Sequence, residues 1–161
     1  MEIAKWMKHP VQCVKPLDSI QHAREIMEKY RINQLPVVVN ARLVGVVTDR
    51  DLRDAFPSVF EADRRSGRVL DPNVITVETV MTPNVLTLAP KDSVVAAARL
   101  MRQERIGAIP IVDAGHIVGI LARSNLLDAF VEIVEAMESS GGDRGAAPPH
   151  RPAGANRGRG H

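Results

Sequence analysis

The stretch LPVVVNARLVGVVTDRDLRDAF occupies residues 35–56, and IPIVDAGHIVGILARSNLLDAF occupies residues 109–130. Both begin with an aliphatic residue and a proline, carry a glycine shortly before a polar cluster, and end in Asp-Ala-Phe. Between Pro16 and Phe56, 15 of 41 positions are identical to the residue 74 positions later, without a gap. Average compositions would give roughly one match in seventeen by chance. The chain therefore contains an internal duplication.

Each copy begins with a predicted helix. In the first copy Asp18 is a candidate N-cap with Gln21 at the third helical position, and apolar residues recur at helical spacing over residues 20–30. In the second copy the same face is carried by Val94, Ala97, Leu100 and Met101. Both helices are therefore expected to be amphipathic.

A hairpin and a second helix are predicted after each of these helices. Pro36 cannot continue a helix, and the β-branched runs at residues 35–39 and 43–47 flank a short polar turn. A further helix is expected from about Asp49, and its counterpart in the second copy is expected to run through Met137.

The two copies are expected to pack on each other as one unit. A single copy of about 50 residues leaves an apolar sheet face and an apolar helix stripe that it cannot cover alone. Two copies can cover each other, which predicts an α/β (α+β) fold. We expect repeats at residues 3–56 and 79–137, a solvated linker at 57–78 and a disordered Gly/Pro/Arg tail at 138–161.

The basic character of the sequence lies in this tail. From Ser139 onward four arginines accompany one aspartate, so the net charge of +2 becomes about −1 when the tail's +3 is removed. A near-neutral folded region has no extended basic face that could follow a phosphate backbone. Nucleic acid is therefore not expected as a partner.

Cysteine content and hydropathy bear on the compartment. Cys13 is the single cysteine, which excludes an internal disulfide, and no apolar run approaches the roughly 18 residues of a membrane span. Charged residues interrupt the N-terminus where a signal peptide would need an apolar segment. We therefore expect a cytoplasmic protein with no membrane partner.

The duplicated pattern resembles the CBS domain family. Its elements are V-x-P, D-S, L-P-V-V and G-V-V-T-x-x-D before a leucine-containing helix, and most of the set occurs twice within about residues 3–135. The chain thus looks like a tandem CBS pair, and residues 54–61 also resemble the acetoin-utilisation B branch of the family. The resemblance implies two interlocked β-α-β-β-α repeats with pseudo-twofold symmetry, often paired into a flat homodimer, with clefts for adenosine-containing ligands.

Thr48 and Asp51 carry the most specific chemistry in the sequence. Thr48 ends a predicted strand and Asp51 lies in the first turn of the next helix, so a hydroxyl and a carboxylate can face one cleft. An ionised carboxylate accepts hydrogen bonds from both hydroxyls of a ribose, while backbone N–H groups at the helix start favour a phosphate. The spacing Thr-x-x-Asp is also typical of a capped helix N-terminus, so both interpretations stay open.

The family resemblance implies which residues form the two clefts. In CBS proteins the T-x-x-D motif holds the ribose, and backbone beside the L-P-V segment and the first strand frames the adenine. By position, the first cleft would use Thr48, Asp51, Arg50, Cys13, Val14, Pro36 and Val37. The second cleft would use Pro110, Ile111, Arg123 and Asn125.

Two departures from the family pattern concern affinity and ligand charge. In the second copy Ala122 lacks the hydroxyl and Asn125 replaces the charged acceptor, so this cleft is expected to bind more weakly. Neither copy has the His or Arg that nucleotide-binding relatives often place just before the L-P step. Among AMP, ADP, ATP and S-adenosylmethionine, this favours AMP or S-adenosylmethionine over a di- or triphosphate.

The sequence favours a binding module over an enzyme. It has no nucleophile-base set, no phosphate-binding glycine loop and no metal-ligand spacing, so we expect no catalysis, metal or resident cofactor. We expect a regulatory module that binds an adenosine-containing ligand and transmits this to an unidentified partner protein. The alternative is a ligand-free dimerisation or interaction module with vestigial clefts. A homodimer is expected through helices whose apolar stripe continues late in the chain.

Overall fold

Each repeat is built around one β-hairpin. The computed structural model describes residues 1–55 and 71–140. In the first repeat β1 (Gln34–Val39) pairs antiparallel with β2 (Arg42–Thr48). In the second repeat β4 (Ala108–Asp113) pairs in the same way with β5 (His116–Ala122), and the register is the same 74 residues later.

Positive backbone angles close both hairpins. Asn40 and Ala41 have φ angles of 50° and 61°, and Ala114 and Gly115 have φ angles of 47° and 80°. Two successive residues with positive φ form a turn whose twist matches that of the paired strands. The two predicted hairpins are therefore confirmed.

A helix precedes each hairpin and another follows it. α1 (Ile20–Tyr30) and α3 (Val94–Gln103) come before the hairpins. Residues 49–55 are helical after β2, and α4 (Arg123–Ser140) follows β5 directly. The long last helix predicted through Met137 is therefore confirmed.

The N-cap of α1 differs from the prediction. Asp18 is not the cap: the Ser19 hydroxyl accepts a hydrogen bond from the backbone N–H of His22 at 3.1 Å. The Asp18 carboxylate accepts instead from the backbone N–H of Lys15 at 2.7 Å, which closes the turn before the helix. The second repeat makes both bonds 74 residues later, so adjacent Asp and Ser side chains divide two tasks.

A short extended segment supplies the first strand of each repeat. Val14 forms a parallel bridge with Val37, and Leu88 forms the same bridge with Ile111. The backbone N–H of Val14 donates to the Pro36 carbonyl at 3.0 Å. Both copies therefore have the β-α-β-β-α order that the resemblance in the sequence implied.

Each repeat completes its core with a segment that precedes the other repeat's first strand. The short helix η1 (Ile3–Lys5) packs on the second repeat, where Ile3 is fully buried beside Ile109 and Leu121. The short helix η2 (Val77–Thr79) packs on the first repeat, where Val77 is fully buried in the same cluster as Leu35. The repeats are therefore interlocked.

The exchanged segments also reach the hairpin edges. β3 (Thr82–Pro83) pairs with β2, and Lys8 bridges Ile120 in β5. A glycine in each hairpin makes room for a methionine of the incoming segment. A Cβ atom on Gly119 would lie 2.5 Å from Met7 Sδ, and one on Gly45 would lie 2.7 Å from Met81 Sδ.

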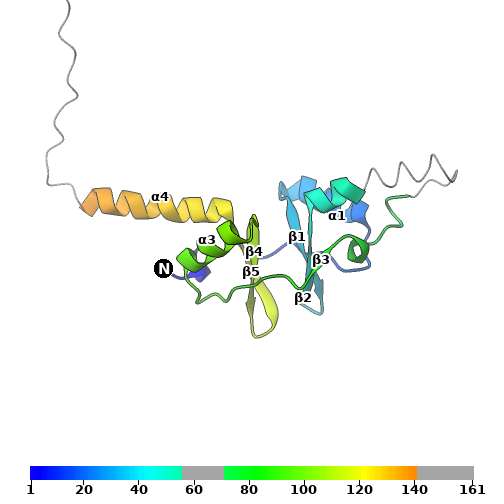
Figure 1. Ribbon diagram of the computed structural model, residues 1–161, viewed down its shortest axis with the longest axis horizontal. Helices are drawn as coiled ribbons and strands as arrows, with labels where there is room; N and C mark the ends of the chain where they lie inside the picture. Colours follow the sequence, from blue (N-terminus) through cyan, green and yellow to red (C-terminus); the bar gives the residue numbers. More distant parts are fainter. Residues whose placement is uncertain (56–70, 141–161) are drawn as a thin grey trace, which may run out of the picture.

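The two hairpins lie side by side at the centre of the molecule, with α1 on one side and α3 and α4 on the other (Figure 1). The backbone N–H of Ile117 in β5 donates to the carbonyl of Ala41 at the tip of the first hairpin, at 3.1 Å. The far end of α4 extends beyond the rest of the second repeat (Figure 1).

Most of the predicted linker and the tail from residue 141 onward lie outside the described residues. The division of the chain at residues 3–56 and 79–137 stays a prediction. Among residues 1–55 and 71–140, no helix has the length and apolar character needed to cross a membrane.

Candidate functional site

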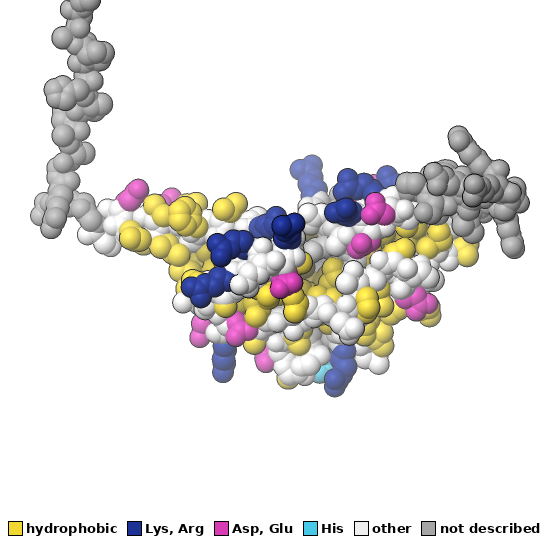
Figure 2. Space-filling view, in the orientation of Figure 1, with side chains coloured by type: hydrophobic (Ala, Val, Ile, Leu, Met, Phe, Trp, Pro, Cys, Tyr) yellow, Lys and Arg dark blue, Asp and Glu magenta, His cyan; other side chains and the backbone are white. Residues whose placement is uncertain are grey.

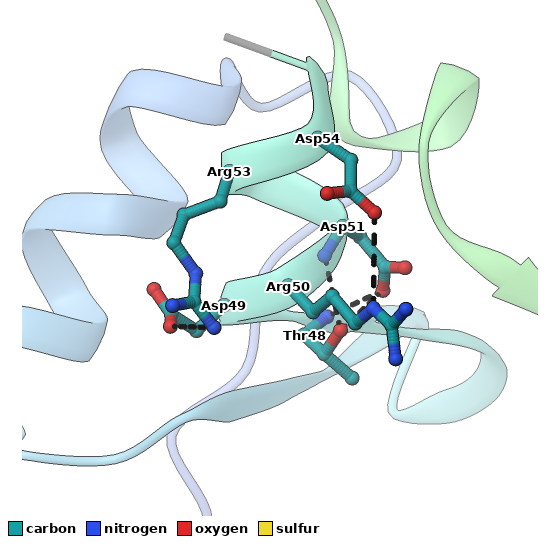
Figure 3. Close-up of polar contacts among 6 residues, drawn as sticks. All are labelled: Thr48, Asp49, Arg50, Asp51, Arg53 and Asp54. Carbon is teal, nitrogen blue, oxygen red and sulfur yellow. Dashed lines mark hydrogen bonds and ion pairs between the residues drawn. The ribbon is translucent and has the colours of Figure 1, made fainter. Parts of the chain in front are cut away.

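Thr48 and Asp51 form a closed pair where β2 ends and residues 49–55 turn helical (Figure 3). The Thr48 hydroxyl donates to Asp51 Oδ2 at 2.7 Å, and the Thr48 backbone N–H donates to the same oxygen at 2.8 Å. The Asp51 backbone N–H in turn donates to Thr48 Oγ1 at 3.2 Å. These reciprocal bonds are a capping box, so the pair does cap the helix.

Two ion pairs flank the capping box on the same short helix (Figure 3). Arg53 lies 3.0 Å from Asp49, and Arg50 lies 3.9 Å from Asp54. All four side chains are well exposed, so these pairs add little to stability. Both guanidinium groups therefore remain accessible to a ligand.

A cavity of about 540 Å³ opens beside this cap, between the two repeats. Its lining comes from the end of β2 with the following helix, from residues 33–34, from the segment at 82–86, and from the loop at 104–108. The apolar part is formed by Val46, Val85, Leu86, Ile106 and Ala108. The charged part is formed by Asp49, Arg50, Arg53, Glu104 and Arg105.

The lining is suited to recognition. Thr48 contributes a hydroxyl, while the carboxylates and guanidinium groups can bind hydroxyls and anions. Within residues 1–55 and 71–140, no histidine or cysteine lines the cavity. Among the described residues, no three His, Cys, Asp or Glu side chains are grouped so that they could hold a metal ion.

The first-repeat residues implied to frame an adenine lie mostly in the core. Val14, Pro36 and Val37 are buried and held together by backbone hydrogen bonds, and none of them lines this cavity. Cys13 is half-buried, its Sγ lies 3.6 Å from the Val11 carbonyl, and burial raises the pKa of its thiol. A role of these residues in binding stays a prediction.

The second repeat keeps half of the capping box. Asn125 Oδ1 accepts from the backbone N–H of Ala122 at 2.9 Å, but Ala122 has no hydroxyl to return the contact. Arg123 Nε donates to the Ile106 carbonyl at 3.1 Å. Pro110 and Ile111 are buried, as their counterparts are in the first repeat.

Four charged residues line the cavity without having been predicted from the sequence, namely Asp49, Arg53, Glu104 and Arg105. Arg105 follows α3 and has a φ angle of 56°, and Arg31 has a φ angle of 52° at the end of α1. Positive φ is uncommon for residues other than glycine. For Arg105, the only signal in the sequence is that the pair Arg-Ile occurs at 31–32 and again at 105–106 within the duplicated block.

Comparison with known proteins gives a family and relatives of similar size. The model of the CBS domain matches residues 2–58 and 77–132. A CBS domain-containing protein of Dictyostelium discoideum is 38% identical over 106 residues, which cover 65% of this chain and 73% of that protein. The CBS domain-containing protein YhcV of Bacillus subtilis is 33% identical over 120 residues, covering 74% of this chain and 79% of that protein.

The same region also occurs inside enzymes. The inosine-5′-monophosphate dehydrogenase of Korarchaeum cryptofilum is 30% identical over 114 residues, which cover 70% of this chain but only 21% of that enzyme. The matches therefore include both small CBS proteins and the CBS region of a larger catalytic chain.

Solved structures of similar fold include complexes with adenosine compounds. CBSX2 in complex with AMP has a TM-score of 0.68 at 29% identity, covering 83% of this chain and 98% of that one. The CBS pair of MJ0100 with 5′-methylthioadenosine and S-adenosyl-L-methionine has a TM-score of 0.66 at 26% identity, with coverage of 83% and 98%. A putative acetoin utilization protein of Vibrio cholerae, at 24% identity and a TM-score of 0.71, covers 86% and 96% and shares the fold.

Proposed function

Because this chain belongs to the CBS domain family as a tandem pair, we propose that it is a regulatory module that binds an adenosine-containing ligand between its repeats. The candidate ligands are AMP, ADP, ATP and S-adenosylmethionine. Binding would change the relative position of the two repeats, and through it the state of an unidentified partner protein.

The cavity beside Thr48 is the observation that carries this proposal. Its volume of about 540 Å³ falls within the range of ordinary small-molecule sites, and it combines apolar side chains with a few polar groups. Because its lining comes from both repeats, a bound ligand would contact both at once. The AMP complex of CBSX2 and the S-adenosyl-L-methionine complex of MJ0100 support an adenosine compound as the occupant.

Helix capping and ribose binding are compatible in this geometry. Thr48 lines the cavity, and its hydroxyl hydrogen is already given to Asp51 Oδ2. The remaining lone pair of Thr48 Oγ1 can therefore accept from a ligand hydroxyl. Asp51 does not itself line the cavity but is bonded to Thr48, which does. Both bonds from Thr48 use Oδ2, so Oδ1 is the carboxylate oxygen that we propose for the ribose.

Calorimetry of the full chain with AMP and S-adenosylmethionine tests the proposal. Asp51→Ala should weaken binding by about tenfold to a hundredfold, the range for a hydrogen bond to a charged group, and Thr48→Ala should cost less. Asp54→Ala is the matched control, because Asp54 is on the same helix but, unlike Asp51, makes no bond to Thr48 in the capping box. Melting temperatures measured in parallel separate a lost cap from lost binding. If the wild-type chain binds no adenosine compound, the proposal is wrong.

The exposed face of α4 favours assembly as a second function, in line with the alternative of an interaction module. Leu127, Phe130 and Met137 are 65%, 62% and 68% exposed, and with Val131 and Val134 they form a stripe at helical spacing. Figure 2 shows hydrophobic side chains gathered over α4 and basic side chains beside them over α3. A contiguous apolar stripe of this kind is typical of an interface.

Charge makes a second copy the best-fitting occupant of this face. Arg99 and Arg102 line the groove between α3 and α4, whereas the later turns of α4 carry Glu135 and Glu138; Glu132 is already paired with Lys5. In a twofold arrangement the acidic side of one copy can meet the arginines of the other. We therefore propose a homodimer through α4.

Light scattering at micromolar concentration tests the dimer. Phe130→Asp should shift the mass toward the single-chain value of 17.6 kDa. Leu17→Asp is the control, because Leu17 is 75% exposed and precedes α1, far from α4 in the chain. A wild-type mass of one chain would exclude the dimer.

A further inference from the structure

We infer that the cavity between the repeats selects a phosphorylated adenosine over a neutral or cationic one, and that Arg105 sets this selectivity. The inference rests on the proposed function and names the ligand class for the same cavity. The residues just before the two X-Pro steps, Asn33-Gln34 and Gly107-Ala108, carry no positive charge. The structure brings arginines from other positions to the cavity.

The charged groups of the lining sum to a positive cavity. Among the described residues, three arginines line it against Asp49 and Glu104, which leaves a net charge of +1. Asp49 lies 3.0 Å from Arg53, so these two charges offset each other. The partner of Arg50 is Asp54, at 3.9 Å, which does not line the cavity.

In this cavity Arg105 and Glu104 of the second repeat carry opposite charges, and further arginines of that repeat lie next to it. Arg105 lines both this cavity and an adjoining cavity of about 360 Å³, which Arg102 and Arg123 also line. The Arg123 side chain is fixed there by its bond to the Ile106 carbonyl. Among the described residues that line these two cavities, the second repeat therefore contributes Arg102, Arg105 and Arg123 against Glu104.

A phosphate suits the combined lining of these two cavities better than a sulfonium does. Guanidinium groups bind phosphate oxygens through paired N–H donors, and exposed charges act over about 8–10 Å at ordinary ionic strength. The sulfonium of S-adenosylmethionine would meet the same field with a positive charge. Neutral adenosine would gain no binding energy from the positive charge of these arginines.

The duplication supplies a matched control for Arg105. Arg31 is the equivalent residue of the first repeat, 74 positions earlier, and both have φ angles in the left-handed region, at 52° and 56°. Gln at either position therefore meets the same backbone demand. Arg31 does not line this cavity.

The experiment is calorimetry of the full chain with AMP, adenosine and S-adenosylmethionine, for wild type, Arg105→Gln and Arg31→Gln. AMP should bind wild type about tenfold more tightly than adenosine, the lower end for a bond to a charged group because Arg105 is exposed. Arg105→Gln should remove most of this advantage and leave adenosine affinity within about twofold, whereas Arg31→Gln should change neither. Salt at about 0.5 M should weaken AMP binding and leave adenosine binding unaffected.

Three results would overturn the inference. AMP and adenosine could bind wild type equally, S-adenosylmethionine could bind more tightly than AMP, or Arg105→Gln could weaken AMP and adenosine alike. Each of these would leave ligand binding between the repeats standing. Absence of binding by all three compounds would instead overturn the proposed function itself. Melting temperatures of both variants show that each is folded when it is assayed.

Discussion

The substitution Gly119→Ala tests whether the N-terminal segment packs on β5, because it adds a single Cβ atom at that contact. The new Cβ would lie 2.5 Å from Met7 Sδ, 2.9 Å from Met7 Cγ and 3.2 Å from Met7 Cβ. Favourable contacts between such atoms lie at about 3.5–4.0 Å. Because the overlap includes Cβ and Cγ, rotating the end of the methionine does not relieve it, and the N-terminal segment must shift. We expect unfolding free energy to fall by about 1–3 kcal/mol, the usual cost of overpacking.

Urea denaturation of the full chain, followed by circular dichroism and by fluorescence of Trp6, measures this cost. Trp6 is the single tryptophan and packs against the second-repeat core, so its emission reports on the same contact. Protein concentration must be held constant, because self-association would add to the apparent stability.

Two further variants make the result decisive. Gly107→Ala is the control, because a Cβ there has no atom within 4 Å, and its stability should equal or slightly exceed that of wild type. Met7→Ala should relieve the overlap, so the double variant should be more stable than the sum of the single effects predicts. Full stability of Gly119→Ala, with additive effects in the double variant, would refute the packing of the N-terminal segment on β5.

Four other outcomes follow from the same structure. Ile3→Ala should lower the unfolding free energy by about 2–5 kcal/mol in urea, since Ile3 is fully buried; a loss below about 1 kcal/mol would contradict its placement. A chain ending at Asp71 lacks Val77 from its core and should show no cooperative thermal transition by circular dichroism; a cooperatively folded monomer would disprove the need for both halves. Removing residues 141–161 should leave the melting temperature nearly unchanged, and a large fall would show that these residues pack on the rest. Burial raises the pKa of the Cys13 thiol above its ordinary value of 9.0, so the contribution of Cys13 to stability is full below pH 9 and declines as the pH rises further. Near pH 9, iodoacetamide should therefore alkylate Cys13 more slowly in the native chain than in the unfolded chain. Equal alkylation rates would contradict this.

The repeat made much of the fold predictable. Fifteen identities at one spacing, together with periods of two and of 3.6 residues, predicted both hairpins and the helices around them. The closeness of Thr48 and Asp51 was predictable for the same reason, since three residues separate them across one strand end. Local pattern could not decide between Asp18 and Ser19 as the cap, because both side chains are good hydrogen-bond acceptors.

Contacts between distant segments were not predictable from the sequence. The segments at residues 3–8 and 77–82 share only one identity, Met7 with Met81, so the duplication is nearly invisible where the repeats exchange partners. The cavity is also assembled from four separate stretches of chain. Arg105, which lines the cavity, has a φ angle in the left-handed region, and an arginine in the sequence does not predict such an angle.

The exchange of residues 1–8 and 75–83 between the repeats sets the order in which a newly made chain can fold. Residues 1–8 leave the ribosome well before their partners, because Lys8 bridges Ile120 and Ile3 packs beside Leu121. At about 5–20 residues per second, roughly 5–20 s pass before those partners have been synthesised. During that interval an apolar N-terminal segment stays uncovered and open to chaperones. A tag attached directly before residues 1–8 would act on this uncovered segment, whereas a tag attached after α4 would be made later than all of its partners.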